Sequence, residues 1–185
     1  MGQKGFYYDS TSCTGCKTCQ IACKDLHDLK VGENLRKVYS FEGGTFPEVW
    51  GYYLSLGCNH CAEPKCAENC PTGAIYKRAE DGLVVQDREK CIGCKMCLWS
   101  CPYERPQYLE EEGKAGKCDG CASLVDQGLN PVCVDSCPMR AIEFGEIEEL
   151  RAKYGDHTDL KVLEHSTFTK PSITINAIHQ AKISG

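Results

Sequence analysis

The stretch CIGCKMCLWSCP, residues 91–102, decides how this chain folds. Its cysteines follow the spacing C-x2-C-x2-C-x3-C, and a proline comes directly after the last of them. The same spacing recurs at residues 13–23, and wider versions of it occur at residues 58–70 and 118–137. All sixteen cysteines of the 185-residue chain fall into these four sets of four. Set by set, they are Cys13, Cys16, Cys19, Cys23; Cys58, Cys61, Cys66, Cys70; Cys91, Cys94, Cys97, Cys101; and Cys118, Cys121, Cys133, Cys137.

This spacing is typical of iron–sulfur ligation, in which three cysteines hold one cubane cluster and the fourth reaches the neighbouring cluster. Sixteen thiolates are enough for four [4Fe–4S] clusters, with no cysteine left over. We therefore predict that every cysteine is a cluster ligand. Zinc is one alternative, but a zinc site built from C-x2-C pairs leaves a surplus cysteine in the first and third sets. A disulfide scaffold is the other, and such scaffolds are usually shorter and do not repeat one spacing.

The distances between the sets predict which sets cooperate. Twenty residues separate Cys70 from Cys91, and their pattern of strand, turn and strand suits a compact two-cluster unit made from the second and third sets. The first and fourth sets then pair around that unit. Pairing of neighbours in chain order is the alternative, which the 34 residues between Cys23 and Cys58 fit less well. The ligand groups favoured by the nested pairing are Cys58, Cys61, Cys66 with Cys101; Cys91, Cys94, Cys97 with Cys70; Cys13, Cys16, Cys19 with Cys137; and Cys118, Cys121, Cys133 with Cys23.

These patterns predict an α+β fold of two ferredoxin-like two-cluster modules, one nested inside the other. The outer module comprises residues 1–57 and 102–145, the nested module residues 58–101, and a mostly extended C-terminal tail residues 146–185. Predicted strands cover residues 5–8, 52–56, 74–77 and 83–86, and in the tail a helix covers 146–154 and extended segments cover 159–163 and 172–178. Elements this short bury little apolar surface, so we expect the clusters to supply much of the folding free energy.

The tail contains no cysteine, and we favour contact with a partner subunit over a role in covering this chain's own core. His60 lies between two cysteines, where we favour a structural role over a hydrogen bond to sulfur. Lysines near the cysteines either adjust the reduction potentials of the clusters or are ordinary solvated side chains. These lysines are Lys17, Lys24, Lys65, Lys90, Lys95 and Lys117.

The sequence lacks the signals that are typical of several classes of function. The formal net charge is −5 and no basic run occurs, which argues against nucleic acid as a partner. We find no phosphate-binding or dinucleotide-binding glycine motif, no apolar run long enough to span a membrane, and no substrate site. We therefore expect a chain that catalyses nothing alone. Residues 1–10 also lack the apolar core of a secretory signal.

The chain resembles the four-cluster iron–sulfur (beta) subunits of the molybdopterin oxidoreductase, or dimethyl sulfoxide reductase, family, and most closely those of the anaerobic dimethyl sulfoxide reductases. The resemblance runs nearly from end to end and includes a motif outside the cysteine sets. The matching stretches include SCTGCKTC at 12–19, ACKD at 22–25, YYLS at 52–55, CNHC at 58–61, CIGC at 91–94, KCDGC at 117–121 and FTKP at 168–171. The segment 40–51 looks shorter than in those relatives, and it contains no predicted ligand.

The resemblance implies four [4Fe–4S] clusters and the nested pairing. It also implies an electron-transfer subunit that relays electrons from a membrane quinol-oxidising anchor subunit to a molybdopterin-containing catalytic subunit. An electron-transfer subunit of a formate dehydrogenase or hydrogenase complex is the alternative. The complex is expected to be peripheral to a membrane, on the extracytoplasmic side if the chain is exported with a signal-bearing partner and on the cytoplasmic side otherwise.

Overall fold

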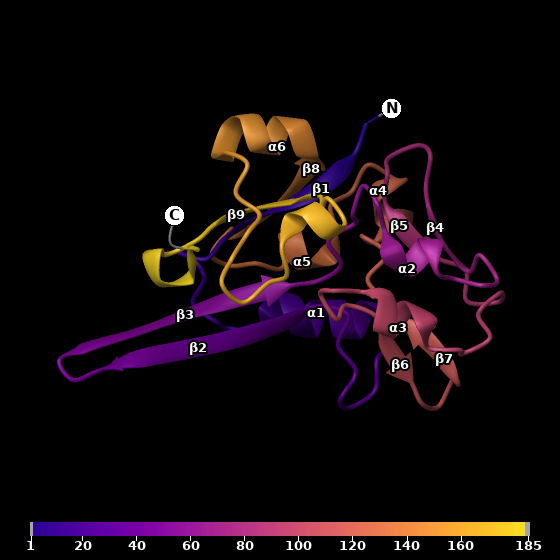
Figure 1. Ribbon diagram of the computed structural model, residues 1–185, viewed down its shortest axis with the longest axis horizontal. Helices are drawn as coiled ribbons and strands as arrows, with labels where there is room; N and C mark the ends of the chain where they lie inside the picture. Colours follow the sequence, from indigo (N-terminus) through magenta and orange to yellow (C-terminus); the bar gives the residue numbers. More distant parts are fainter. Residues whose placement is uncertain (1, 184–185) are drawn as a thin grey trace.

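A three-stranded sheet joins the two ends of the chain in this computed structural model, which describes residues 2–183. The central strand β1 (Lys4–Asp9) pairs antiparallel with β8 (Ile142–Glu146) and parallel with β9 (Ile173–Asn176). β1 contributes Phe6, Tyr7 and Tyr8, aromatic residues that favour strands, and all three are buried. Residues more than a hundred positions apart in sequence therefore lie side by side in one sheet (Figure 1).

Helix α6 (Ile147–Tyr154) packs against this sheet, and its bounds confirm the predicted helix to within one residue. Ile147 and Leu150 are buried on its inner face. Tyr154 stacks on Tyr7, with ring centroids 3.6 Å apart and ring planes 8° from parallel. The acidic residues of its first turn and the basic residues of its last turn match the helix dipole.

The longest strands form a hairpin, β2 (Lys37–Thr45) with β3 (Glu48–Leu56), in continuous antiparallel register from Lys37↔Leu56 to Thr45↔Glu48. Figure 1 shows its turn extending away from the rest of the protein. The end of β3 near the body buries Leu54 and Leu56, whereas the residues near the turn are exposed. The predicted strand at 52–56 is thus the inner half of a longer strand.

The cysteine sets are carried by short helices and the loops before them. The helices are α1 (Thr18–Leu26), α2 (Lys65–Glu68), α3 (Met96–Ser100), α4 (Ala122–Val125) and α5 (Val132–Asp135). Helix α1 contacts α5, and α2 contacts α3. None of the helices formed by residues 2–183 is long and apolar enough to cross a membrane.

Two small antiparallel pairs complete the fold. Strands β4 (Ile75–Lys77) and β5 (Val84–Gln86) confirm the predicted strand pair between the second and third cysteine sets. Strands β6 (Gln107–Leu109) and β7 (Lys114–Gly116) form a pair that we did not predict from the sequence. The architecture is therefore a mixture of helices and strands with small sheets.

The apolar core is divided into clusters that contain cysteines. One joins the central sheet to Cys19, Cys133 and Cys137, and a second places Cys23, Cys58 and Cys118 beside two leucines. A third contains Cys66 and Cys97, with Ile75 and Val84. Because the thiols lie inside the packed core, whatever they bind also holds the core together.

The C-terminal tail differs from our expectation. Its strand β9 is buried in the central sheet, and Thr169 of the FTKP motif is 1% exposed. This part of the tail therefore covers the chain's own core, and the favoured role in partner contact was wrong for it. Apart from α6 and β9, the tail contains two short 3-10 segments, Ser166–Phe168 and His179–Ala181.

The predicted extended segment at 159–163 was also wrong. Within it only Leu160 forms a strand-like bridge, to Lys182. The carboxylate of Asp159 accepts hydrogen bonds from the backbone N–H and the hydroxyl of Ser166, at 2.7 and 3.0 Å. These bonds close a loop, so the alternation of polar and apolar residues here reflects one buried leucine between exposed neighbours.

Candidate metal centres

The cysteine loops share a left-handed backbone residue just before the second cysteine of the set. Gly15, Gly93 and Gly120 occupy this position with φ of 69°, 71° and 71°. Glycine adopts this conformation without steric cost, which explains its presence in three of the four sets. In the remaining set the position is His60, with φ of 42°. A non-glycine residue held there indicates a side chain with a specific task.

The first group of thiols combines two distant parts of the chain. Cys13, Cys16, Cys19 and Cys137 line one hollow at the surface. Backbone N–H groups of Gly15 and Ala141 point at the Sγ atoms of Cys13 and Cys137, each at 3.4 Å. Hydrogen bonds to the sulfur atoms are one way in which a protein sets the properties of a bound cluster. Cys16 is the exposed member of this group.

A second group forms where α1 meets α5. Burial raises the pKa of Cys23, and the neighbouring Cys118, Cys133 and Cys121 add to the effect. Burial likewise raises the pKa of Cys121 to about 12, again with Cys118 and Cys133 nearby. Each of these four thiols makes ionisation of the others less favourable, and this mutual effect shows that the four lie close together.

The other two groups lie around α2 and α3. Burial raises the pKa of Cys66 to about 12, and Cys58, Cys101 and Cys61 contribute to that shift. Burial raises the pKa of Cys97 to about 11, with contributions from Cys91, Cys70 and Cys94. Cys94 is exposed. In each of the four groups, three thiols come from one set and one comes from another.

All sixteen cysteines carry free thiols. The raised pKa values mean that buried thiols keep their protons at neutral pH until a metal displaces them. Soft thiolates in groups of four suit iron–sulfur clusters or zinc, and the three-plus-one composition is the arrangement of two-cluster ferredoxins. The residues therefore fit [4Fe–4S] clusters by ligand type, number and grouping.

His60 lies between two of these groups. Its ring is fully buried, and Nδ1 accepts a hydrogen bond from the backbone N–H of Val84 at 3.0 Å. Burial, with the nearby charges of Lys117 and Arg36, lowers the pKa of His60 well below its usual value. The neutral ring therefore carries its proton on Nε2, which faces Cys118 Sγ at 3.9 Å. The favoured structural role was incomplete, because the ring also directs a donor at a sulfur.

Lys117 is buried beside His60, unlike the other lysines considered from the sequence. Its Nζ donates to the carbonyl oxygens of Val84 and Cys118. Burial alone favours the neutral amine, but the neighbouring Cys58, Cys118 and Cys66 raise the pKa of Lys117 overall. The sequence placed Lys117 beside a cysteine but contained no signal that separated it from solvated lysines.

Nothing in the sequence led us to predict a role for Arg36. It is buried against the inner end of the β2–β3 hairpin, and Cys133, Cys118, Cys19 and Cys23 surround it. No local pattern marks it, since charged residues are common just before a strand. Only the packing of distant segments places it among thiols.

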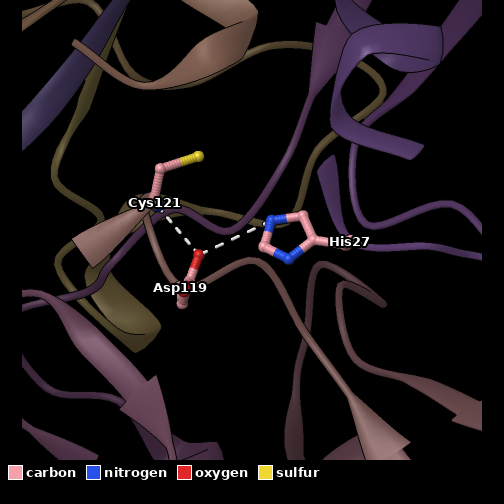
Figure 2. Close-up of side chains that lie close together, drawn as sticks. All are labelled: His27, Asp119 and Cys121. Atoms are coloured by element: carbon pink, nitrogen blue, oxygen red, sulfur yellow. Dashed lines mark hydrogen bonds and ion pairs between the residues drawn. The ribbon is translucent and has the colours of Figure 1, made fainter. Parts of the chain in front are cut away.

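A smaller cluster of possible ligands lies at the edge of the second group. Figure 2 shows His27, Asp119 and Cys121, whose ligand atoms lie within 4.8 Å of one another. Asp119 Oδ1 accepts a hydrogen bond from the backbone N–H of Cys121 at 2.8 Å and faces His27 Nε2 at 3.8 Å. Because Cys121 already belongs to the second group of thiols, this trio is part of that group's surroundings and not a separate metal site.

The class of protein follows from this geometry together with a family comparison. Residues 49–147 match the family model described as a 4Fe-4S dicluster domain, and residues 10–32 match a 4Fe-4S binding domain. Together these matches cover all four cysteine sets, and they define a protein that binds [4Fe–4S] clusters.

Comparison with curated proteins narrows the class. The sequence is 45% identical over 194 residues to the B subunit of the anaerobic dimethyl sulfoxide reductase of Haemophilus influenzae, covering 100% of this protein and 94% of that one. It is 49% identical over 191 residues to the probable anaerobic dimethyl sulfoxide reductase subunit YnfG of Escherichia coli K12, covering 99% and 93%. It is also 34% identical over 167 residues to the formate dehydrogenase iron-sulfur subunit of Wolinella succinogenes, covering 78% and 82%. This protein belongs to the family of anaerobic dimethyl sulfoxide reductase iron–sulfur B subunits.

Proposed function

We propose that this chain is a non-catalytic electron-transfer subunit that holds four [4Fe–4S] clusters in a row. Each cluster has three ligands from one cysteine set and one from the paired set, in an outer module (1–57 and 102–145) and a nested module (58–101). The proposed ligands are Cys13, Cys16, Cys19 and Cys137; Cys118, Cys121, Cys133 and Cys23; Cys58, Cys61, Cys66 and Cys101; and Cys91, Cys94, Cys97 and Cys70. A [4Fe–4S] cluster takes up and releases one electron without making or breaking a bond to its ligands.

The observation that carries this proposal is the succession of four thiol groups through the protein. Cys19 and Cys23 lie on the same helix and link the first two groups. His60 links the second group to the third, because its backbone N–H donates to Cys58 Sγ at 3.4 Å while its ring faces Cys118. Cys66 and Cys97 share one apolar cluster and link the third group to the fourth.

The ends of this row are its accessible points. Cys16 in the first group and Cys94 in the fourth are the exposed cysteines, whereas the second group is made of buried ones. Electrons can therefore enter at one end and leave at the other, while the thiols of the second group are shielded from water. Such an arrangement supports a relay between two partners.

The partners in this proposal are a membrane quinol-oxidising anchor subunit and a molybdopterin-containing catalytic subunit, in a complex peripheral to the membrane. The names of relatives as B subunits of anaerobic dimethyl sulfoxide reductases support this assignment. A role in a formate dehydrogenase complex is the second candidate, because a formate dehydrogenase iron-sulfur subunit is also a relative.

A ligand substitution in the native complex tests the relay. Cys97→Ser should abolish turnover driven by quinol and spare turnover driven by an artificial donor that reduces the catalytic subunit directly. Ser100→Ala is the matched control on the same helix, because its hydroxyl donates within that helix, to the carbonyl oxygen of Met96 at 2.8 Å. Equal loss with both donors contradicts the relay. Metal analysis of the complex tests for the molybdopterin-containing partner: molybdenum with a large partner chain supports the proposal, and nickel, which a hydrogenase partner would bring, opposes it.

A further inference from the structure

Arg36 is held rigidly at the base of the β2–β3 hairpin. Its side chain belongs to a residue only 3% exposed, and Nη1 donates to the backbone oxygen and the hydroxyl of Ser55, at 3.1 and 3.2 Å. Its Cζ lies 5.1 Å from the centre of the Phe6 ring, a cation–π distance. Contacts with two strands and one aromatic face fix where its charge lies.

Within residues 2–183, no carboxylate pairs with this buried charge. No ion pair involving Arg36 occurs among the residues for which the structure gives a placement, and its Nε has no hydrogen-bond partner there. A guanidinium taken out of water without a counter-charge costs several kcal/mol, so a buried arginine requires an anion nearby.

Cysteines are the anionic candidates that surround Arg36. Burial opposes its charge, but Cys133, Cys118, Cys19 and Cys23 together raise the pKa of the guanidinium. The hydroxyl of Ser55 connects Nη1 to Cys19, since its Oγ lies 3.2 Å from Cys19 Sγ.

Glycine at position 57 keeps this space open. A Cβ atom there would lie 3.3 Å from Arg36 Nη2 and 3.6 Å from Cys118 Sγ, so a side chain at this position would crowd the guanidinium and touch that thiol. Cys19 belongs to the first thiol group, whereas Cys118 belongs to the second. The arginine therefore borders two groups at once.

We propose that Arg36 is a fixed positive charge shared by two neighbouring [4Fe–4S] clusters, those of the Cys13 and Cys118 groups, and that it raises the reduction potential of both. This inference rests on the proposed function, because it requires clusters at those thiols. Reduction adds one negative charge to a cluster and changes no bond, so a nearby cation in a poorly screened interior stabilises the reduced form. Arg36 thus acts through the clusters as a positioning residue of the relay.

Arginine suits this place better than lysine. Its charge is spread over a planar group that is always protonated, so one side chain can face two anions in different directions. Lys117 and His60 lie between the second and third groups, beside Cys118 and Cys58, and the His60 ring is neutral. Arg36 is consequently the fixed charge expected to dominate between the first two groups.

The test is a potentiometric titration followed by electron paramagnetic resonance on the full chain, purified anaerobically with its clusters. In Arg36→Met, two of the midpoint potentials should fall by about 59 mV or more, which is a tenfold loss in the one-electron reduction equilibrium constant. The equilibrium constants of the other clusters should change by less than twofold. Arg36→Lys should lie between Arg36→Met and the native chain. Arg88→Met is the control: it removes an exposed arginine paired with Glu112 at 2.9 Å. It should change no reduction equilibrium constant by more than twofold.

Unchanged potentials in Arg36→Met, or equal falls in Arg36→Met and Arg36→Lys, overturn the inference. If Arg36→Met does not retain its clusters, the iron content decides: retention in Arg36→Lys supports a required positive charge, and equal loss in both variants opposes it. A native chain that holds fewer than four clusters contradicts the proposed function itself and is recognised before any variant is compared.

Discussion

Two glycines that face each other across the central sheet allow a controlled test of how the tail is held. Gly5 in β1 and Gly145 in β8 are direct partners in the antiparallel register. A Cβ at Gly5 would lie 2.2 Å from the backbone oxygen of Ser172 and 2.9 Å from Ile147 Cδ1. A Cβ at Gly145 would meet its nearest atom, Leu150 Cγ, only at 4.0 Å. The same substitution therefore clashes at one position and fits at the other.

Gly5→Ala should destabilise the protein by about 1–3 kcal/mol, because ordinary contact begins near 3.4 Å and a backbone oxygen cannot move aside as a side chain can. For a chain of this length, 1 kcal/mol corresponds to roughly 2–4 °C in the unfolding midpoint, so we expect a fall of about 2–12 °C. Gly145→Ala should leave the midpoint unchanged or raise it slightly, since alanine restricts the unfolded chain.

The assay is anaerobic thermal unfolding followed by cluster absorbance, at one scan rate for all variants. Hydrogen exchange should also increase in β9 of Gly5→Ala, because the clash falls on Ser172, whose carbonyl oxygen accepts the hydrogen bond of the Phe6 N–H at 3.1 Å. Equal midpoints for the two variants would refute the close approach of β9 to β1 and the packing of the tail that depends on it.

Three further outcomes are expected. Tyr103→Phe should cost about 1–3 kcal/mol, since the buried Thr169 hydroxyl donates to the Tyr103 oxygen at 3.1 Å and would lose its partner. Adding Thr169→Val should recover part of that loss in unfolding experiments, and strict additivity of the two changes contradicts the bond. Burial, with Asp9 and Tyr154 adding, raises the pKa of Tyr7 to about 12. The folded protein therefore holds this proton more tightly than the unfolded chain, so its contribution to stability is complete below pH 10 and declines from there towards pH 12. Unfolding midpoints measured across this range should decline less in Tyr7→Phe, and parallel declines count against the assignment. Removal of iron by a chelator should abolish most of the far-ultraviolet circular dichroism, and a spectrum that persists shows a core independent of its clusters.

Much of the site could be predicted because its chemistry is local in sequence. In three of the four sets the first three cysteines lie within nine residues of each other, so their spacing alone indicates the type of metal centre. The amphipathic pattern of α6 and the strand, turn and strand between the second and third cysteine sets are also local, and the structure confirms both.

The surroundings of the thiols could not be predicted in the same way. Lys117 and Arg36 read as ordinary surface residues, because most charged side chains are solvated and nothing near them in sequence indicates burial. His60 carries a left-handed backbone at a position where the other sets have glycine. That irregularity was visible in the aligned sets, but its hydrogen bond to the N–H of Val84 was not.

The sequence by itself determined the kind of cofactor, the number of available ligands and the family, because these depend on residue type and short-range spacing. Only the tertiary structure decided that β9 enters the central sheet in parallel beside β1, and that a buried arginine lies between two groups of thiols. Strand order and buried charge depend on segments far apart in the chain meeting in one core. The free energy of that meeting is a sum over many packed contacts, which no short stretch of sequence contains.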